Sequence, residues 1–175
     1  MSRDAVARRL VTFGIGTAWY AVDVAHVERV LRHEGVFPIP NMPPWMEGMI
    51  EYRGRIVPVI NLGQRLGLDV PSGGGARRLL VLTLGEDVVA AAVDQVVDVR
   101  PVADGDVAPP PALVRGVAGE CLRGVLRRDD TMVLLLDVAR LLHAADRRAI
   151  DDCLAPPDVD GPTSAPRTAD VPVNV

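Results

Sequence analysis

A short arginine–glycine corner between two apolar segments constrains the fold of this chain more than any other feature. Residues 49–52 and 55–60 have the composition of strands, and Arg53-Gly54 lies between them as the turn of a hairpin. Gly54 can adopt the positive φ angle that a tight turn requires. Arginine is rarely placed beside strands this apolar without a partner. Arg53 therefore has two interpretations: an internal ion pair that stiffens the corner, or a contact with another molecule.

The rest of the chain also consists of short apolar segments separated by turns. Alternating or continuous apolar patterns predict strands at 10–15, 19–24, 78–84, 88–93, 96–100, 114–118, 121–126 and 131–136. Short helical segments are predicted at 25–31 (or an irregular strand there), 43–46, 62–66, 138–143 behind an Asp137 cap, and 146–154. The second half thus repeats the pattern of the first. Many short strands of this kind close into barrels or sandwiches, which indicates a mostly β protein.

The length of 175 residues predicts one domain, or two small lobes that share a core. The run Pro71-Ser72-Gly73-Gly74-Gly75 is the best candidate for a connection between lobes. Residues 155–175 carry scattered prolines and aspartates without apolar periodicity. We therefore expect a folded region at 1–154 and a disordered tail at 155–175.

Charge and cysteine usage exclude several classes of protein. The net charge is −4, which argues against a nucleic-acid-binding protein, since such proteins usually carry a basic field. Cys121 and Cys153 lie far apart without metal-ligand spacing, so we expect reduced thiols. The N-terminus has no apolar signal segment, and no run is long enough to span a bilayer. We expect a cytoplasmic protein without direct membrane insertion.

No residue pattern indicates catalysis. All of the basic residues are arginine, which removes lysine-based nucleophiles, phosphate loops and response-regulator receivers. His26, His33 and His143 lack metal spacing, and no serine lies in a Gly-x-Ser-x-Gly motif. We expect no enzyme activity, no cofactor and no metal site.

Several segments together resemble the CheW family, the adaptor proteins of bacterial chemosensory arrays. The segments that carry the resemblance are Leu10–Ile15 with Trp19–Val24, Pro43–Leu62 with its Arg53-Gly54 corner, Leu80–Gly85, Val93–Val99 and Met132–Leu142. The resemblance implies two SH3-like five-stranded β-barrels, packed over a shared core with short helices. It places them near residues 10–70 and 76–145, with strands possibly exchanged between them.

The resemblance also implies a function. CheW-like proteins are non-enzymatic adaptors that join the regulatory domain of a CheA-type histidine kinase to the cytoplasmic hairpin tips of chemoreceptors. Arg53 matches the family's arginine at the corner, and Gly54 would place it. An exposed apolar patch for a partner is the alternative to a core role for Val27, Val30, Leu31 and Trp45. Protein-binding candidates are Arg53, Gly54, Glu51, Val27, Leu31, Trp45, Gly48 and Val57, and Gly48 is also expected to end the turn at 43–46.

The chain departs from the family pattern at three places. Glu51-Tyr52 replaces Asn-Leu before the corner, Arg29 replaces a frequent glutamate, and Asn61 replaces an aspartate. Two of these changes alter charge where partners would lie, so they bear on the identity of the partner more than on the fold. The alternatives are therefore a divergent CheW-like adaptor of a non-flagellar chemosensory pathway, or a ligand-binding β-barrel protein.

Overall fold

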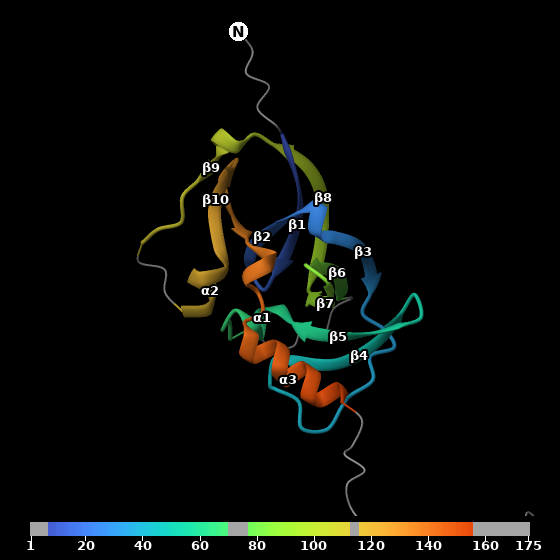
Figure 1. The fold of residues 1–175 in the computed structure, drawn as a ribbon. Coiled ribbons are helices and arrows are strands. Elements are labelled where there is room, and N and C mark those ends of the chain that lie inside the picture. The colour runs from blue at the N-terminus through green and yellow to red at the C-terminus, as the bar shows by residue number, and fades with distance from the viewer. Residues whose placement is uncertain (1–6, 70–76, 113–115, 156–175) are drawn as a thin grey trace, which may run out of the picture.

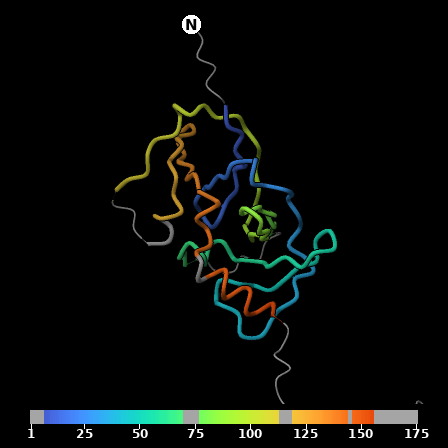
Figure 2. The backbone as a smooth tube through the Cα atoms, in the orientation of Figure 1, coloured from blue at the N-terminus to red at the C-terminus, as the bar shows by residue number. Residues whose placement is uncertain are grey.

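Two β-sheets, each curled toward a barrel, are stacked on one another in the computed structural model (Figure 1), which describes residues 7–69, 77–112 and 116–155. The chain begins in the upper sheet, forms the lower one, returns to the upper one and ends in a helix beside the lower sheet (Figure 2). The predicted mostly β architecture is confirmed. The expected break at 71–75 and the expected tail from residue 156 onward lie outside the described residues.

The first barrel is a sheet of six strands. Their order is β8 (Gln95–Val102), β1 (Arg8–Ile15), β2 (Ala18–Asp23), β11 (Thr131–Leu136), β10 (Leu122–Arg128) and β9 (Val107–Ala108). Neighbouring strands are antiparallel except for β2 and β11, which are parallel. The sheet exceeds the expected five strands because the two-residue β9 extends its edge.

The second barrel is a sheet of five strands. Their order is β3 (Val27–Arg32), β6 (Arg78–Leu84), β7 (Asp87–Val93), β5 (Arg55–Asn61) and β4 (Met46–Tyr52). Here the parallel pair is β5 and β7. Each barrel therefore has the same plan: a central hairpin, one antiparallel neighbour on one side, and a second hairpin added in parallel on the other.

The second barrel is nested inside the first along the sequence. Its strands all lie within residues 27–93, whereas the first barrel combines residues 8–23 with residues 95–136. The lobes expected at 10–70 and 76–145 thus exchange hairpins: β1–β2 joins the later strands, and β6–β7 joins the earlier ones.

Strands that are buried on both faces explain the long apolar runs of the sequence. In β1, Val11, Phe13 and Ile15 point into a core shared by the two barrels, whereas Leu10 points into the first barrel. In β6, Leu80 faces the shared core. Its neighbours on that strand, Leu79 and Val81, fill the second barrel. Burial of this kind contributes about 25 cal/mol per Å² of apolar surface, so the shared core stabilises the contact between the two barrels.

Short helices follow the strands, and several of them pack against the shared core. The helices are η1 (Val24–His26), α1 (Leu62–Arg65), η2 (Asp104–Asp106), α2 (Gly116–Cys121), η3 (Val138–Arg140) and α3 (Ala144–Leu154). Asn61 and Asp137 cap α1 and η3 by accepting hydrogen bonds from backbone N–H groups, as their residue types favour. Arg65 is 7% exposed and joins these layers: its Nε donates to the Leu141 carbonyl over 2.9 Å.

Four local predictions are corrected by the structure. Residues 116–121 form helix α2 where a strand over 114–118 was predicted, and residues 114 and 115 lie outside the described residues. The 43–46 segment is a single turn closed by a hydrogen bond from Met46 N–H to the Pro43 carbonyl. Gly48 does not end that turn, because β4 already begins at Met46. The helix expected through His143 is the three-residue η3.

Candidate protein-interaction surface

The β4–β5 hairpin carries the arginine corner on a two-residue turn. Arg53 and Gly54 have φ angles of 51° and 72°, and Tyr52 pairs with Arg55 across the turn. Two consecutive positive φ angles match the twist of a tight hairpin, so the positive φ angle predicted for Gly54 is confirmed. Figure 1 shows this hairpin extending beyond the rest of the second sheet.

Arg53 is exposed, and its guanidinium carbon lies 5.1 Å from the centre of the Tyr52 ring. Within the described part of the chain it forms no ion pair. A left-handed conformation costs a non-glycine residue roughly 1–2 kcal/mol. The corner therefore holds a cation in solvent, stacked on an aromatic ring, at a position that glycine or asparagine would occupy with less strain.

Two exposed apolar side chains lie beside this hairpin. Ile56 is 59% exposed and pairs with Glu51 across the strands. Phe37 is 65% exposed and forms an isolated bridge with Met49 on the free edge of β4. Large exposed apolar side chains on and beside a hairpin that carries an exposed arginine are typical of a protein contact.

Ile56 also borders a groove between β5 and α3, with a volume of about 230 Å³. Pro58 from β5 and Ile150 and Leu154 from α3 line the same groove, together with Arg55 and Arg147. The acidic residues Glu86, Asp87 and Asp151 line it too. The groove therefore combines apolar side chains with side chains of both charges.

Sequence reasoning missed Ile56 and Phe37, because both belong to apolar segments that read as core. The two-residue turn was the available signal for Ile56: it fixes the hairpin register, which sets Ile56 opposite the polar Glu51. For Phe37 no comparable signal exists, since the bridge to Met49 is long-range.

The other predicted site residues lie deeper. Val27 and Trp45 are half-buried against the shared core, and Leu31 packs against the interior of the second barrel. The Arg65 guanidinium carbon lies 5.6 Å from the Trp45 ring centre, so the indole is already in contact within the fold. Val57 is 1% exposed and Gly48 is buried, so neither offers a side chain to a partner in this structure. Only Arg53, Gly54 and Glu51 share the exposed hairpin.

Gly48 has a clear structural role. Its φ angle is 150°, and a Cβ atom added there would lie 2.2 Å from the Phe37 carbonyl oxygen. The absence of a side chain lets the Phe37 segment close against β4. Gly48 thereby shapes the surface on which Phe37 is exposed.

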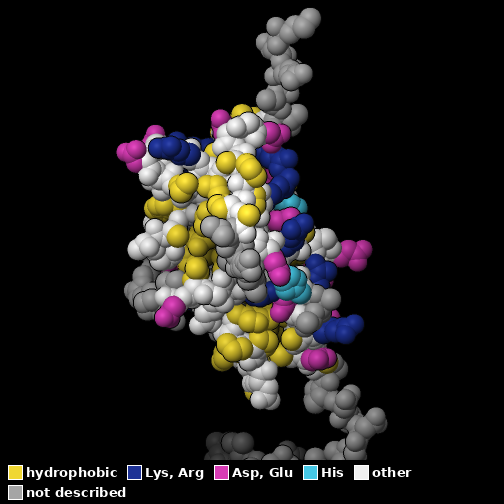
Figure 3. Space-filling model, turned by 90° about the vertical axis from the view of Figure 1, so that its left-hand side faces the viewer, with side chains coloured by type: hydrophobic (Ala, Val, Ile, Leu, Met, Phe, Trp, Pro, Cys, Tyr) yellow, Lys and Arg dark blue, Asp and Glu magenta, His cyan; other side chains and the backbone are white. Residues whose placement is uncertain are grey.

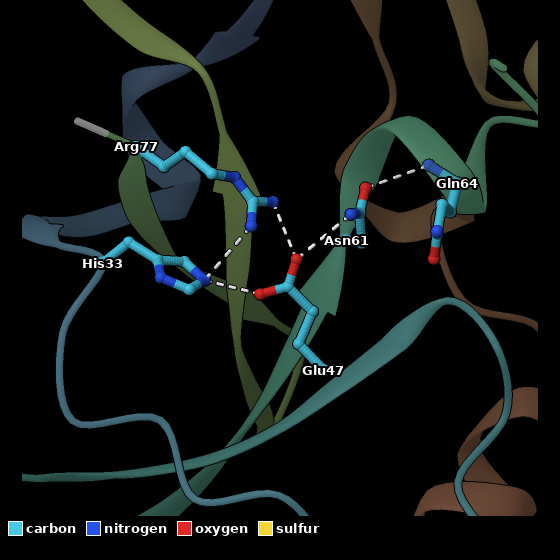
Figure 4. A network of polar contacts seen from close by, with 5 residues as sticks. All are labelled: His33, Glu47, Asn61, Gln64 and Arg77. Atoms are coloured by element: carbon cyan, nitrogen blue, oxygen red, sulfur yellow. Dashed lines mark hydrogen bonds and ion pairs between the residues drawn. The ribbon is translucent and has the colours of Figure 1, made fainter. Parts of the chain in front are cut away.

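A polar network closes the second barrel where its edge strands β3 and β4 approach (Figure 4). Glu47 on β4 accepts from His33 Nε2 over 2.5 Å, from Arg77 over 2.7 Å and from Asn61 Nδ2 over 3.1 Å. Burial alone raises the pKa of Glu47, but the hydrogen bonds and positive charges of Arg77 and His33 outweigh it and lower the pKa overall. The carboxylate thus ties together the end of β3, the start of β6 and the cap of α1.

The first barrel is closed in a similar way. Asp98 on β8 accepts from Arg128 at the end of β10 over 2.8 Å. This hydrogen bond is the main cause that lowers the pKa of Asp98. The two ion pairs have a structural explanation, so they are not candidate catalytic groups.

Hydrophobic and charged side chains occupy different parts of the surface on one face of the molecule. Figure 3 shows hydrophobic side chains in the middle of one face, with charged and histidine side chains along one side. Among the described residues no cluster of His, Cys, Asp or Glu is arranged to hold a metal ion. In the same part of the chain, no helix is both long enough and apolar enough to cross a bilayer.

Comparison with known proteins gives a consistent result. Residues 9–146 match the family described as the CheW-like domain. The chain is 30% identical to the chemotaxis protein CheW of Treponema pallidum over 145 residues, which cover 79% of this chain and 84% of that protein. It is 31% identical to protein FrzA of Myxococcus xanthus over 140 residues, covering 79% and 87%.

A solved structure is also similar. The crystal structure of the scaffolding protein TtCheW from Thermoanaerobacter tengcongensis superposes with a TM-score of 0.70 at 27% sequence identity. The match covers 78% of this chain and 92% of that one. Both nested barrels therefore fall within a known architecture.

Proposed function

Because the chain belongs to the CheW family, we propose that it is a non-enzymatic adaptor that joins chemoreceptor tips to a CheA-type histidine kinase in a chemosensory array. The kinase would be bound through its regulatory domain, and the receptor through its cytoplasmic hairpin tip. Chemotaxis proteins and a scaffolding protein among its relatives support this assignment.

The observation that carries the proposal is the exposed Arg53 on the β4–β5 hairpin. Its guanidinium presents several N–H donors to solvent and suits a planar carboxylate on a partner. The strained left-handed conformation holds this group at the tip of a rigid hairpin. Ile56 on the same hairpin and Phe37 at the outer edge of β4 offer exposed apolar side chains that can anchor a protein contact.

Titration calorimetry of the purified protein against the regulatory domain of the CheA-type kinase from the same organism tests the kinase half. Binding at micromolar affinity or tighter is expected, together with a specific loss of affinity in Ile56→Asp. Absence of heat with two folded partners would refute the kinase contact.

The receptor half needs a separate titration with a receptor hairpin-tip fragment. Arg53→Glu is expected to weaken that binding by about 1–3 kcal/mol, the scale of a charge-assisted hydrogen bond. Arg53→Lys is the matched control: it retains the charge but lacks the bidentate fork, so it should lose part of the affinity. Equal binding by all three proteins would remove Arg53 from the receptor contact.

A further inference from the structure

An aromatic ring, and no carboxylate of the described residues, holds the Arg53 side chain. The guanidinium carbon lies 5.1 Å from the centre of the Tyr52 ring. A Cβ atom added at Gly54 would meet nothing within 4 Å beyond its chain neighbours, so the turn is surrounded by open space. Of the two interpretations of Arg53 that the sequence allows, the internal ion pair is therefore absent from the described part of the chain, and the ring takes its place.

Tyr52 is anchored in the core although it borders the turn. It is the last residue of β4, and its side chain is only 7% exposed. It packs with Ile50, Val57 and Val59 in the interior of the second barrel. Close-packed neighbours fix the rotamer of a buried side chain. The ring of Tyr52 is therefore a rigid base for the exposed Arg53.

The hydroxyl group of Tyr52 does not explain why an aromatic residue occupies this position. It is buried and has no hydrogen-bond partner among the described residues, which costs the folded state free energy. Phenylalanine would fill the same space without that cost, and leucine, the residue of the family pattern, would also suit an apolar interior. The contact that distinguishes an aromatic side chain from leucine here is the one with Arg53.

Another arginine–aromatic pair in the same molecule shows the contrast. The Arg65 guanidinium carbon lies 5.6 Å from the centre of the Trp45 ring. Arg65 also donates to the Leu141 carbonyl and pairs with Asp146, so it would stay in place without the indole. Arg53 has no such further contact within the described residues, and loss of the Tyr52 ring should release its side chain.

We propose that Tyr52 is a positioning residue of the receptor contact: its ring fixes the Arg53 guanidinium in one orientation before the partner binds. A contact with a ring face uses the positive charge of the guanidinium and leaves its N–H donors to a carboxylate of the partner. A side chain that is already ordered loses less entropy on binding, so the ring raises the affinity. The inference rests on the proposed function, and it makes Tyr52 a determinant of partner choice.

Titration calorimetry of the full chain against a receptor hairpin-tip fragment tests this role. Tyr52→Leu should raise the Kd about two- to fivefold, the effect of losing an exposed cation–π contact. Tyr52→Phe should bind as the wild type does, with an equal or higher melting temperature, because it keeps the ring and removes the unpaired hydroxyl. Equal or tighter binding by a folded Tyr52→Leu variant overturns the proposal.

Ile50→Val is the matched control for a loss of core volume. Ile50 is 5% exposed and belongs to the same cluster as Tyr52, so its truncation also lowers the melting temperature but leaves the ring in place. This variant should bind the receptor fragment as the wild type does. A Kd that rises in Ile50→Val as much as in Tyr52→Leu would show that the affinity follows stability, which contradicts a positioning role.

A double-mutant cycle tests whether Tyr52 acts through Arg53. Arg53→Gln removes the cation, so Tyr52→Leu should weaken binding in the wild-type background and have no further effect in Arg53→Gln. Additive losses would mean that the ring affects the partner without the arginine, and the positioning role would be refuted.

Nuclear magnetic resonance of the free protein gives a readout that needs no partner. The side-chain Nε–Hε signal of Arg53 is identified by its absence in Arg53→Lys. Its heteronuclear NOE should show an ordered side chain in the wild type and in Tyr52→Phe, and a mobile one in Tyr52→Leu. An ordered Arg53 without receptor binding by the wild type would refute the proposed function, whereas an Arg53 equally mobile in all three proteins would refute the role of Tyr52.

Discussion

The Nδ2 group of Asn61 donates a hydrogen bond to Glu47 Oε1 over 3.1 Å, while its Oδ1 accepts from the backbone N–H of Gln64 over 3.1 Å. One side chain thus caps α1 and binds the carboxylate that closes the second barrel. The aspartate expected here from the family resemblance would place a second carboxylate against Glu47. The amide at position 61 therefore has an explanation inside the fold.

Asn61→Asp should destabilise the protein by about 1–2 kcal/mol at neutral pH, because a hydrogen bond is replaced by repulsion between carboxylates. Urea unfolding followed by circular dichroism measures the change. The double variant Asn61→Asp/Glu47→Gln removes the repulsion, so its loss of unfolding free energy should be smaller than the sum of the losses in the two single variants. Additive losses would show that the two side chains do not interact.

Gly48→Ala should destabilise the protein by about 3 kcal/mol or prevent folding, since its Cβ atom would overlap the Phe37 carbonyl oxygen. Thermal unfolding is the measurement. Gly105→Ala is the control: an added Cβ atom there meets nothing within 4 Å, and the φ angle is not positive. Similar melting temperatures for the two variants would mean that the Phe37 segment does not pack against β4 as described.

Acid should weaken both barrels over the same pH range. The pKa values of Glu47 and Asp98 are lowered in the folded protein, so each carboxylate contributes stability above its unfolded pKa of about 4. That contribution is lost as the pH falls through the folded pKa. The urea concentration at the unfolding midpoint should therefore fall as the pH is lowered below about 4. It should fall less steeply in Glu47→Gln and in Asp98→Asn. Parallel curves for the wild type and both variants would contradict this origin.

Asp146→Asn should lower the free energy of unfolding by weakening the attachment of α3 to the rest of the protein. The Arg65 Nη2 group donates to Asp146 over 2.5 Å in a largely buried pair, so removal of the carboxylate leaves a buried cation uncompensated, at a cost of about 3–5 kcal/mol. Arg65→Met should cost less, since it removes the charge and keeps an apolar side chain near Trp45. Asp152→Asn, at an exposed position of the same helix, is the control and should stay within about 0.5 kcal/mol of the wild type.

Arg53→Asn should preserve or slightly raise stability, by up to about 1 kcal/mol, because Asn-Gly is the preferred sequence for a two-residue turn with two positive φ angles. Thermal unfolding gives this value, and the binding titrations give the corresponding loss of partner affinity. A marked fall in melting temperature would show that Arg53 serves the fold instead.

The strands were predictable because they alternate or are continuously apolar, and because glycine and proline mark their turns. β1, β5, β6 and β11 lie within about two residues of their predicted bounds. Helix α2 was not predictable: its residues, Gly116-Val117-Ala118-Gly119, suit a short apolar strand as well as a helix. Local composition does not decide between the two when a segment is this short.

The candidate surface was predicted only in part, for a physical reason. Arg53 and Gly54 were found because their chemistry conflicts with the apolar strands around them. Val57 and Ile56 are adjacent and both apolar, yet one is 1% exposed and the other 59%. Which of them faces solvent depends on sheet register and on where α3 packs, and these are long-range properties.

The nesting of the barrels sets the order in which the chain can bury its apolar surface as it leaves the ribosome. All strands of the second barrel have been synthesised once Val93 has been added, and after they emerge that barrel can cover Val11 and Phe13 on the shared-core side of β1. Leu10 and Ala21, on the other side of the β1–β2 hairpin, pack with Leu126, Val133 and Leu135. One face of the first two strands thus stays uncovered until the last strands have been synthesised. A nascent chain that stalls before Thr131 therefore leaves the β1–β2 hairpin exposed to aggregation.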